Sequence, residues 1–486
     1  MMWSPEIALI AALVIPLIGG LFVGLLGKTP NFREGATLTA AVLLALNVAY
    51  LVSVTGDRPE LTYAIGDTGL SFGFRLEPLG AVFAAVASGL WIVNSLYSIG
   101  YMRGNNEQNQ TRFYVFFTIA IACAMGVALA SNLLTMFVFY EALTLSTYPL
   151  VAHKGDGNAR RGAAIYLAIL LGTSIGLLLP AIIATQFIAG STDFIVGGLL
   201  KSQVTPLIAS VLLILFAFGI GKAALMPVHP WLPNAMVAPT PVSALLHAVA
   251  VVKAGVFAIL KVATYIFGPE TIQSAPASEW LAWIAAISIV LASIIAMSSN
   301  NLKRRLAFST VSQLSYVTLG AMIAAPLALL GAALQIVMHA WGKITLFMCA
   351  GAIYTATKKT EISDMRGLGH LMPWTFGAFT VGAFAIIGLP PFGGMWPKLY
   401  LMLGAASAGQ LALIGALILS SVLNVAYLLP LSARGFFDPP PKEGLKKPGP
   451  VLAVLPPVIT AAGITVLFFL IGPLTEFLAP VFEVEL

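Results

Sequence analysis

A glutamate and a group of lysines lie well inside long apolar segments of this sequence, where charge is costly. Glu141 lies about midway along the segment FVFYEALTLSTYPL. An ionised carboxylate at the centre of a bilayer costs at least ~2.5–3.5 kcal/mol, so it needs a partner or a function. Buried lysine can release its proton whereas arginine stays charged, so this set could carry protons. The lysines are Lys222, Lys253, Lys261, Lys343 and Lys398.

The spacing of the first two lysines limits what each can do. Lys222 sits one turn before a proline-rich stretch, beside the small residues of GIG. Snorkelling of its amine to the interface is the alternative to a role as a buried carrier. Lys253 lies twelve residues past Pro241, or ~18 Å at 1.5 Å per residue, which is too deep for snorkelling. His247 precedes Lys253 by six residues, so we expect a water between them.

Further nitrogen side chains follow later in the chain. His339 and Lys343 are four residues apart in QIVMHAWGKITLF, a spacing that puts both on one face of a helix. A protonated pair there would repel, which argues against a packing role for the histidine. Lys398 directly follows a second proline-rich stretch. For Lys261 we expect snorkelling, with a role at a pore exit as the alternative.

Glu141 also has two interpretations. A carboxyl that is protonated, or hydrogen-bonded to a neighbouring helix, would have no role in transport. The functional interpretation is a proton or cation site whose charge depends on burial and on a nearby lysine.

The composition predicts an all-α polytopic membrane protein. Hydrophobic residues make up 59% of the chain, charged residues 9%, and the mean hydropathy is +0.95, which excludes an ordinary soluble domain. Cys123 and Cys349 lie in apolar segments and are expected to pack there. The chain has no Cys/His spacing typical of a metal site and no nucleotide loop, so we expect no metal and no cofactor. Apolar segments of spanning length predict about fourteen helices, at 7–27, 35–54, 79–101, 113–130, 133–151, 162–188, 207–227, 241–267, 278–299, 305–324, 327–356, 374–400, 407–433 and 451–473.

Two of these helices should be broken, because proline removes a backbone donor and clashes with the preceding turn. A broken backbone at membrane depth must lie against protein or a water-filled cavity. The breaks are five spans apart, which predicts two inverted repeats of five helices. The predicted break residues are Pro227, Pro230, Pro233, Pro390 and Pro391. The expected divisions are 1–112 (three helices), 113–267 (first repeat), 278–433 (second repeat) and 434–486 (a loop and the last helix).

The loop charges predict the orientation of the chain. Of 25 basic residues, seventeen fall in loops on one predicted face and five lie within spans. Only Arg58, Arg75 and Lys201 fall on the other face. The positive-inside rule then places both termini on the outer, periplasmic face of a bacterial plasma membrane.

Five motifs resemble the antiporter-like subunits shared by respiratory complex I and the Mrp-type cation/proton antiporters. They are FVFYEALTLSTYPLVA, GKAALMPVHPWLPNAMVAPTPVSALLHAVAVVKAGVF, LAFSTVSQLSYVTLG, MHAWGKITLFMCAGAI and GLPPFGGMWPKLYL. The resemblance covers about residues 70–430. It implies a glutamate–lysine pair and a line of bases leading to the second break. The matching residues are Glu141, Lys222, Lys253 and Lys398, with His247, His339 and Lys343 as links.

The resemblance implies a proton-translocating subunit of a multi-subunit Na⁺/proton antiporter, with other membrane subunits and lipid as partners and no nucleic acid. Lys398 within its motif resembles the D subunit of Mrp antiporters, because some complex I subunits carry glutamate there. The first alternative is a proton-pumping subunit of complex I or of a membrane-bound hydrogenase. A stand-alone secondary transporter would show polar side chains at the breaks, and a passive membrane anchor would not need buried lysines. No redox chemistry of its own is expected.

Overall fold

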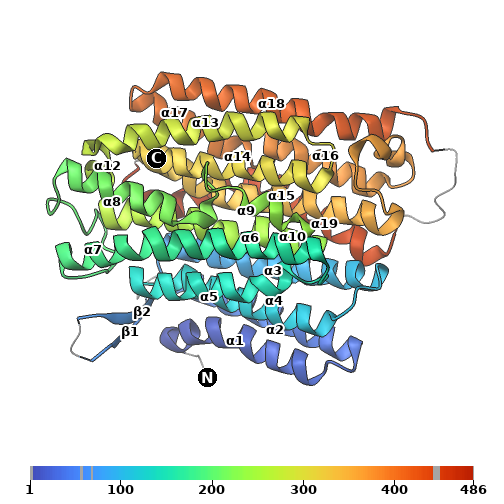
Figure 1. Cartoon of the computed structure of the whole chain (residues 1–486), viewed down its shortest axis with the longest axis horizontal. Helices are drawn as coiled ribbons and strands as arrows, with labels where there is room; N and C mark the ends of the chain where they lie inside the picture. Colours follow the sequence, from blue (N-terminus) through green and yellow to red (C-terminus); the bar gives the residue numbers. More distant parts are fainter. Residues whose placement is uncertain (1–3, 55–58, 67–68, 442–448, 485–486) are drawn as a thin grey trace.

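The protein is a bundle of helices that run along a common direction (Figure 1). The computed structural model describes residues 4–54, 59–66, 69–441 and 449–484. Among these residues, twelve helical stretches are long and apolar enough to cross a membrane. Two shorter apolar helices, Pro206–Gly219 and Pro373–Ile387, are the first halves of the two spans predicted to break. The prediction of an all-α polytopic fold with about fourteen spans is therefore confirmed.

The first half of the chain contains one hairpin and the helices up to the end of the first repeat. They are α1 (Pro5–Leu25), α2 (Pro30–Ser53), β1 (Glu60–Ala64), β2 (Ser71–Arg75), α3 (Pro78–Gly104), α4 (Gln110–Leu129), α5 (Leu133–Val151), α6 (Gly157–Thr173), η1 (Ser174–Leu178), α7 (Leu179–Ala189), α8 (Pro206–Gly219), η2 (Gly221–Ala223), α9 (Trp231–Asn234), η3 (Ala235–Val237), α10 (Thr240–Ala244), η4 (Leu245–Val249), α11 (Val251–Lys261) and η5 (Val262–Phe267). β1 and β2 pair antiparallel. Helices α6–α7 and α10–η5 are each one continuous span; π-helical turns interrupt both, and a bend at Ala250 also interrupts the second.

The second half repeats the pattern of long helices with one break. Its elements are α12 (Pro269–Ser274), α13 (Pro276–Ser298), α14 (Leu302–Ile323), α15 (Pro326–Thr357), η6 (Ile362–Met365), η7 (Leu368–His370), α16 (Pro373–Ile387), α17 (Met395–Ser407), α18 (Leu411–Phe437), α19 (Val451–Phe469), α20 (Ile471–Leu478) and η8 (Ala479–Val481).

Both proline-rich stretches interrupt a helix as the sequence predicts. α8 ends at Gly219, and the segment with Pro227, Pro230 and Pro233 forms short turns instead of a spanning helix. In the second break α16 ends before Gly388, whose φ of +91° suits glycine, and α17 begins at Met395. The freed backbone groups at both breaks are available to side chains, because proline cannot continue the helical ladder.

The two expected repeats share a backbone motif at their second helix. Asn132 and Asn301 cap α5 and α14 with their side chains, which satisfies a free amide of the first turn. Leu133 N donates to Thr192 O at 2.9 Å, and Leu302 N donates to Thr360 O at 3.0 Å. In both cases the acceptor follows the third helix of its repeat. Since each repeat has five spans, the same motif occurs at opposite ends of the bundle, as expected for inverted repeats.

The basic loops gather at one end of the bundle, where α2, α4, α6 and α14 begin; we call this end the basic face. The described chain ends, Ser4 and Val484, lie towards the other end (Figure 1). Arg58, Lys442, Lys446 and Lys447 lie outside the described residues. Among the described residues, the basic face carries Lys28, Arg33, Arg103, Arg112, Lys154, Arg160, Arg161, Lys303, Arg304, Arg305, Lys358, Lys359, Arg366 and Arg434.

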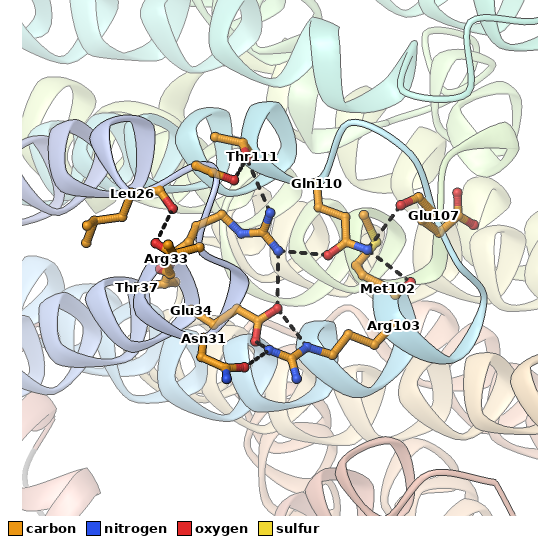
Figure 2. A network of polar contacts seen from close by, with 12 residues as sticks. Leu26, Asn31, Arg33, Glu34, Thr37, Met102, Arg103, Glu107, Gln110 and Thr111 are labelled. Carbon is orange, nitrogen blue, oxygen red and sulfur yellow. Dashed lines mark hydrogen bonds and ion pairs between the residues drawn. The ribbon is translucent and has the colours of Figure 1, made fainter.

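At the basic face a buried carboxylate and its arginine partners tie α2, α3 and α4 together. Figure 2 shows Glu34 of α2 between Arg33, which is also in α2, and Arg103 of α3. Arg33 also donates to Gln110 of α4 at 2.8 Å and lies 5.2 Å from the ring centroid of Tyr114. Arg33 and Glu34 are both buried. These arginines therefore hold helices together in addition to marking the topology.

Replacing Glu34 tests this network. The change Glu34→Gln removes the charge partner of the buried Arg33, and breaking a buried pair in this way costs about 3–5 kcal/mol in the free energy of unfolding. Glu270→Gln removes the partner of Lys201 in an exposed ion pair and should cost less than about 1 kcal/mol. Denaturation of both variants in the same detergent measures the difference. Equal stability of the two variants would contradict a structural role for Glu34.

Candidate functional site: a buried row of lysine, histidine and hydroxyl groups

Lys222 and Glu141 are brought to neighbouring positions but do not form a direct ion pair in the described structure. Lys222 is fully buried in η2, immediately after α8 ends. Its Nζ donates to the carbonyl oxygen of Tyr140 at 2.7 Å and lies 3.1 Å from the centroid of that ring. The Tyr140 hydroxyl accepts from the Lys222 backbone amide at 3.0 Å. The ammonium of Lys222 therefore rests on the residue next to Glu141.

Glu141 differs from the other buried acids. Both of its carboxyl oxygens are inaccessible to solvent and lack a hydrogen-bond partner among the described residues. Glu34 and Glu77, which sequence reasoning missed because they lie at helix ends, are buried in ion pairs. An unpartnered buried carboxyl is costly. Of these three acids, Glu141 is therefore the one whose position packing does not explain.

The break is held in place by close backbone packing. Gly255 of α11 lies against the backbone of Lys222 and Ala223, where a Cβ would clash. Trp231 Nε1 donates to Gly221 O at 3.0 Å, across the turn that carries Lys222. Because Gly255 has no side chain, α11 can approach the broken segment closely.

The centre of the molecule contains a direct contact between the two repeats. Lys253 Nζ of α11 lies 2.6 Å from His339 Nδ1 of α15, and both side chains are buried. The structure thus brings together two residues that are 86 positions apart in the sequence. His247 lies in the π-helical turn η4, with its ring centroid 4.5 Å from that of Phe347. Its ring nitrogens have no hydrogen-bond partner among the described residues.

Beyond His339 the polar row continues through groups that sequence reasoning missed. Lys343 Nζ donates to Ser309 Oγ of α14 at 2.5 Å. Ser309 Oγ lies 2.7 Å from the hydroxyl of Tyr427, which donates to Asn424 Oδ1 at 2.5 Å. Serine, tyrosine and asparagine are common in apolar helices, so their spacing alone carried no signal. Their approach depends on how α14, α15 and α18 pack.

Lys398 occupies the second break in a way that parallels Lys222. It is buried in α17, and its Nζ donates to Ile387 O at 2.7 Å and to Ser421 Oγ at 3.0 Å. Ile387 is the last residue of α16, so the break supplies the free carbonyl. Each broken helix therefore carries a buried lysine that donates to a backbone carbonyl.

The expectation that Lys261 snorkels is wrong. Its side chain is completely buried, forms an ion pair with Glu77 at 3.3 Å, and donates to Ala130 O. Glu77 also pairs with Arg75 at 2.6 Å. A buried carboxylate provides a closer and stronger partner than the distant interface. Arg75 and Glu77, directly before α3, were the sequence signal for this ion pair. In predicting the orientation of the chain, Arg75 was counted only as a loop charge.

The chemistry available along this row is proton exchange. Lysine, histidine, tyrosine and serine groups can each accept or donate a proton, and they follow one another at hydrogen-bonding distances in parts of the row. The described residues contain no group of three or more His, Cys, Asp and Glu side chains that could hold a metal ion. Cys123 and Cys349 are buried free cysteines, as their predicted packing role requires.

Comparison with known proteins places this arrangement among membrane proteins of one family. The family described as "NADH:quinone oxidoreductase/Mrp antiporter, TM" matches residues 130–424. "NADH-Ubiquinone oxidoreductase (complex I), chain 5 N-terminus" matches residues 63–114. The two expected repeats, residues 113–267 and 278–433, lie largely within the first match.

Individual relatives agree with these matches. NADH-quinone oxidoreductase subunit N of Desulforudis audaxviator is 30% identical over 91% of this chain and 89% of its own length. The A/B subunit of a probable K⁺/H⁺ antiporter of Rhizobium meliloti is 30% identical over 86% of this chain, but only 43% of its own length is covered. The chain thus spans less than half of that relative.

Solved structures show the same fold. A chain of the Mrp complex from Dietzia sp. DQ12-45-1b has a TM-score of 0.85 and 26% identity, covering 99% of this chain and 52% of its own. A chain of respiratory complex I from Thermus thermophilus has a TM-score of 0.85 and 22% identity, covering 98% of both chains.

The close approach at Gly255 gives a test of the site geometry. Gly255→Ala places a methyl against the Lys222 backbone and should lower the free energy of unfolding by roughly 1–3 kcal/mol through overpacking. Gly172→Ala in α6 is the matched control, since nothing lies within 4 Å of its added methyl. Parallel unfolding curves in detergent measure both effects. Indistinguishable curves for the two variants would show that α11 does not pack on the break.

Proposed function

We propose that this chain, which belongs to the NADH:quinone oxidoreductase/Mrp antiporter family, translocates protons across the membrane as one subunit of a multi-subunit complex. The observation that carries the proposal is the 2.6 Å contact between Lys253 and His339. It links a lysine of the first proposed repeat, residues 113–267, to a histidine of the second, residues 278–433. A proton that reaches one repeat thereby has a direct route into the other.

The proposed route begins at the first break and ends at the second. Protons are taken up near the broken first segment and pass from Lys222 to Lys253, with His247 beside the path. They continue through His339 and Lys343 and leave near Lys398. Ser309 of α14 links Lys343 to the Tyr427 hydroxyl and the Asn424 amide of α18. Water must complete the longer gaps, since direct proton transfer needs hydrogen-bonding distance.

Glu141 is the proposed gate of this route. In the described arrangement Lys222 rests on Tyr140, where the ring face and the carbonyl both attract an ammonium group. Turning Lys222 towards Glu141 would form an ion pair and hold the lysine in its charged form. Movement back to Tyr140 breaks that pair and makes the proton easier to release. Two neighbouring positions for one amine are therefore enough for a gate.

Lys261 is assigned a structural role in this proposal. Its charge is already matched by Glu77, and Glu77 is shared with Arg75. A group held between fixed charges at a helix end is a poor transient carrier. The alternative role at a pore exit therefore has less support than an exit near Lys398.

The host complex is proposed to be a Na⁺/proton antiporter in a bacterial plasma membrane, with both chain ends on the outer face. The similarity to a chain of the Mrp complex supports this choice. A redox-driven complex of the complex I type is the second candidate, because the subunit N relative matches over most of its length. Proton movement driven by a Na⁺ pulse in membrane vesicles indicates an antiporter, and movement driven by NADH oxidation indicates the redox complex.

The gate is tested by removing either of its charges. Lys222→Ala and Glu141→Ala should each reduce coupled proton movement in inverted vesicles at least about tenfold, because loss of a hydrogen bond or ion pair to a charged group costs roughly 1.5–3 kcal/mol. Lys201→Ala, which removes a lysine from an exposed ion pair, should leave the rate unchanged. Gel analysis of the assembled complex checks that each variant is present. Near-normal rates in either gate variant would refute the proposed function.

A further inference from the structure

A cavity of about 250 Å³ opens at the basic face, outside the proton row. It lies where the linker between the first break and α10 meets the start of α14 and the loop after α15. Its lining combines polar and apolar groups from all of these segments. Because a water molecule occupies about 30 Å³ in the liquid, the cavity has room for a group the size of several waters.

Three lysines from separate segments line this cavity. Lys154 follows α5, Lys303 lies in the first turn of α14, and Lys359 follows α15. Lys303 Nζ donates to Ala238 O at 2.5 Å, and Lys359 Nζ donates to Asp364 O at 2.7 Å. Each of these two ammonium groups is thus fixed by one backbone carbonyl and keeps two further protons to donate.

No carboxylate lines the cavity or forms an ion pair with its lysines in the described structure. Among the described residues, none of the three lysines forms an ion pair, and no aspartate or glutamate lines the cavity. The nearby Glu361 carboxylate accepts from Asn301 instead. In contrast, Arg33, Arg75 and Lys261 all pair with buried acids elsewhere. An anion would therefore complete the charge balance of this cavity.

The position of the cavity narrows the choice of anion. It lies at helix ends on the basic face, and the ends of spanning helices fall near the depth of lipid headgroups. Basic pockets between transmembrane helices at this depth are suited to acidic phospholipid headgroups. Asn301 caps α14 directly at the cavity, and the positive end of a long helix adds to the attraction for phosphate.

We propose that this cavity binds a phosphate group through Lys154, Lys303 and Lys359, with the headgroup of an acidic phospholipid as its source. A bound phosphate would contact Lys303, which donates to Ala238 O. It would therefore fix the linker that connects the first break to α10. The site would then make the arrangement of the first break depend on the surrounding lipid.

The test uses the purified, assembled complex in detergent, titrated with phosphatidylglycerol or with inorganic phosphate and followed by native mass spectrometry. The wild type should retain phosphatidylglycerol, and the variant Lys154→Gln/Lys303→Gln/Lys359→Gln should bind it at least about tenfold more weakly, since each lost charged contact weakens binding by that order. Lys358→Gln is the matched control, because this neighbouring lysine donates to Asn105 and does not line the cavity.

A second measurement needs no substitution. A photoreactive phosphatidylglycerol should crosslink wild-type protein within residues 236–238 or 301–303, and inorganic phosphate at millimolar concentration should not compete. If inorganic phosphate prevents the crosslink, the cavity binds phosphate, but its ligand is the free anion and the assignment to a lipid headgroup is wrong. Equal binding by the triple variant and Lys358→Gln, together with crosslinks only elsewhere, would overturn the proposal.

Discussion

The structure depends on the cost of leaving a charge or a free backbone group unmatched in a hydrocarbon environment. Two buried carboxylates meet this constraint with fixed cationic partners: Glu34 with two arginines, and Glu77 with Arg75 and Lys261. These groups lie at helix ends and hold elements together. Glu141 lies in mid-helix with no hydrogen-bond partner in the described structure. The contrast separates charges that stabilise the fold from one that is available for function.

At each helix break a buried lysine binds a backbone carbonyl oxygen instead of a counter-ion. Proline frees backbone groups at membrane depth, where water is scarce. Lys398 uses the carbonyl that ends α16, and Lys222 uses the carbonyl and ring of Tyr140. A lysine bound to a neutral carbonyl keeps its charge stabilised without a permanent counter-ion. Such a lysine can change its proton or its partner more readily than one locked in a salt bridge, as Lys261 is.

Sequence reasoning predicted the elements better than the contacts. The proline stretches and the span lengths predicted both broken helices, because these depend on local backbone chemistry. Lys253 and His339 were both named, but their direct contact depends on the packing of α11 against α15. Ser309, Tyr427 and Asn424 were missed, since such residues are ordinary in helices until packing brings them together. Lys261 was misjudged because its partner, Glu77, is 184 positions earlier in the chain.

The central claim is that protons cross between the two repeats at Lys253 and His339. The most direct test measures proton translocation by the reconstituted complex carrying Lys253→Gln, His339→Gln or both changes. We expect each single change to lower the translocation rate at least about tenfold and the double variant to be no slower than the singles, because residues that act as one unit have non-additive effects. Translocation at the wild-type rate in either single variant, or losses that simply multiply in the double variant, would contradict this claim.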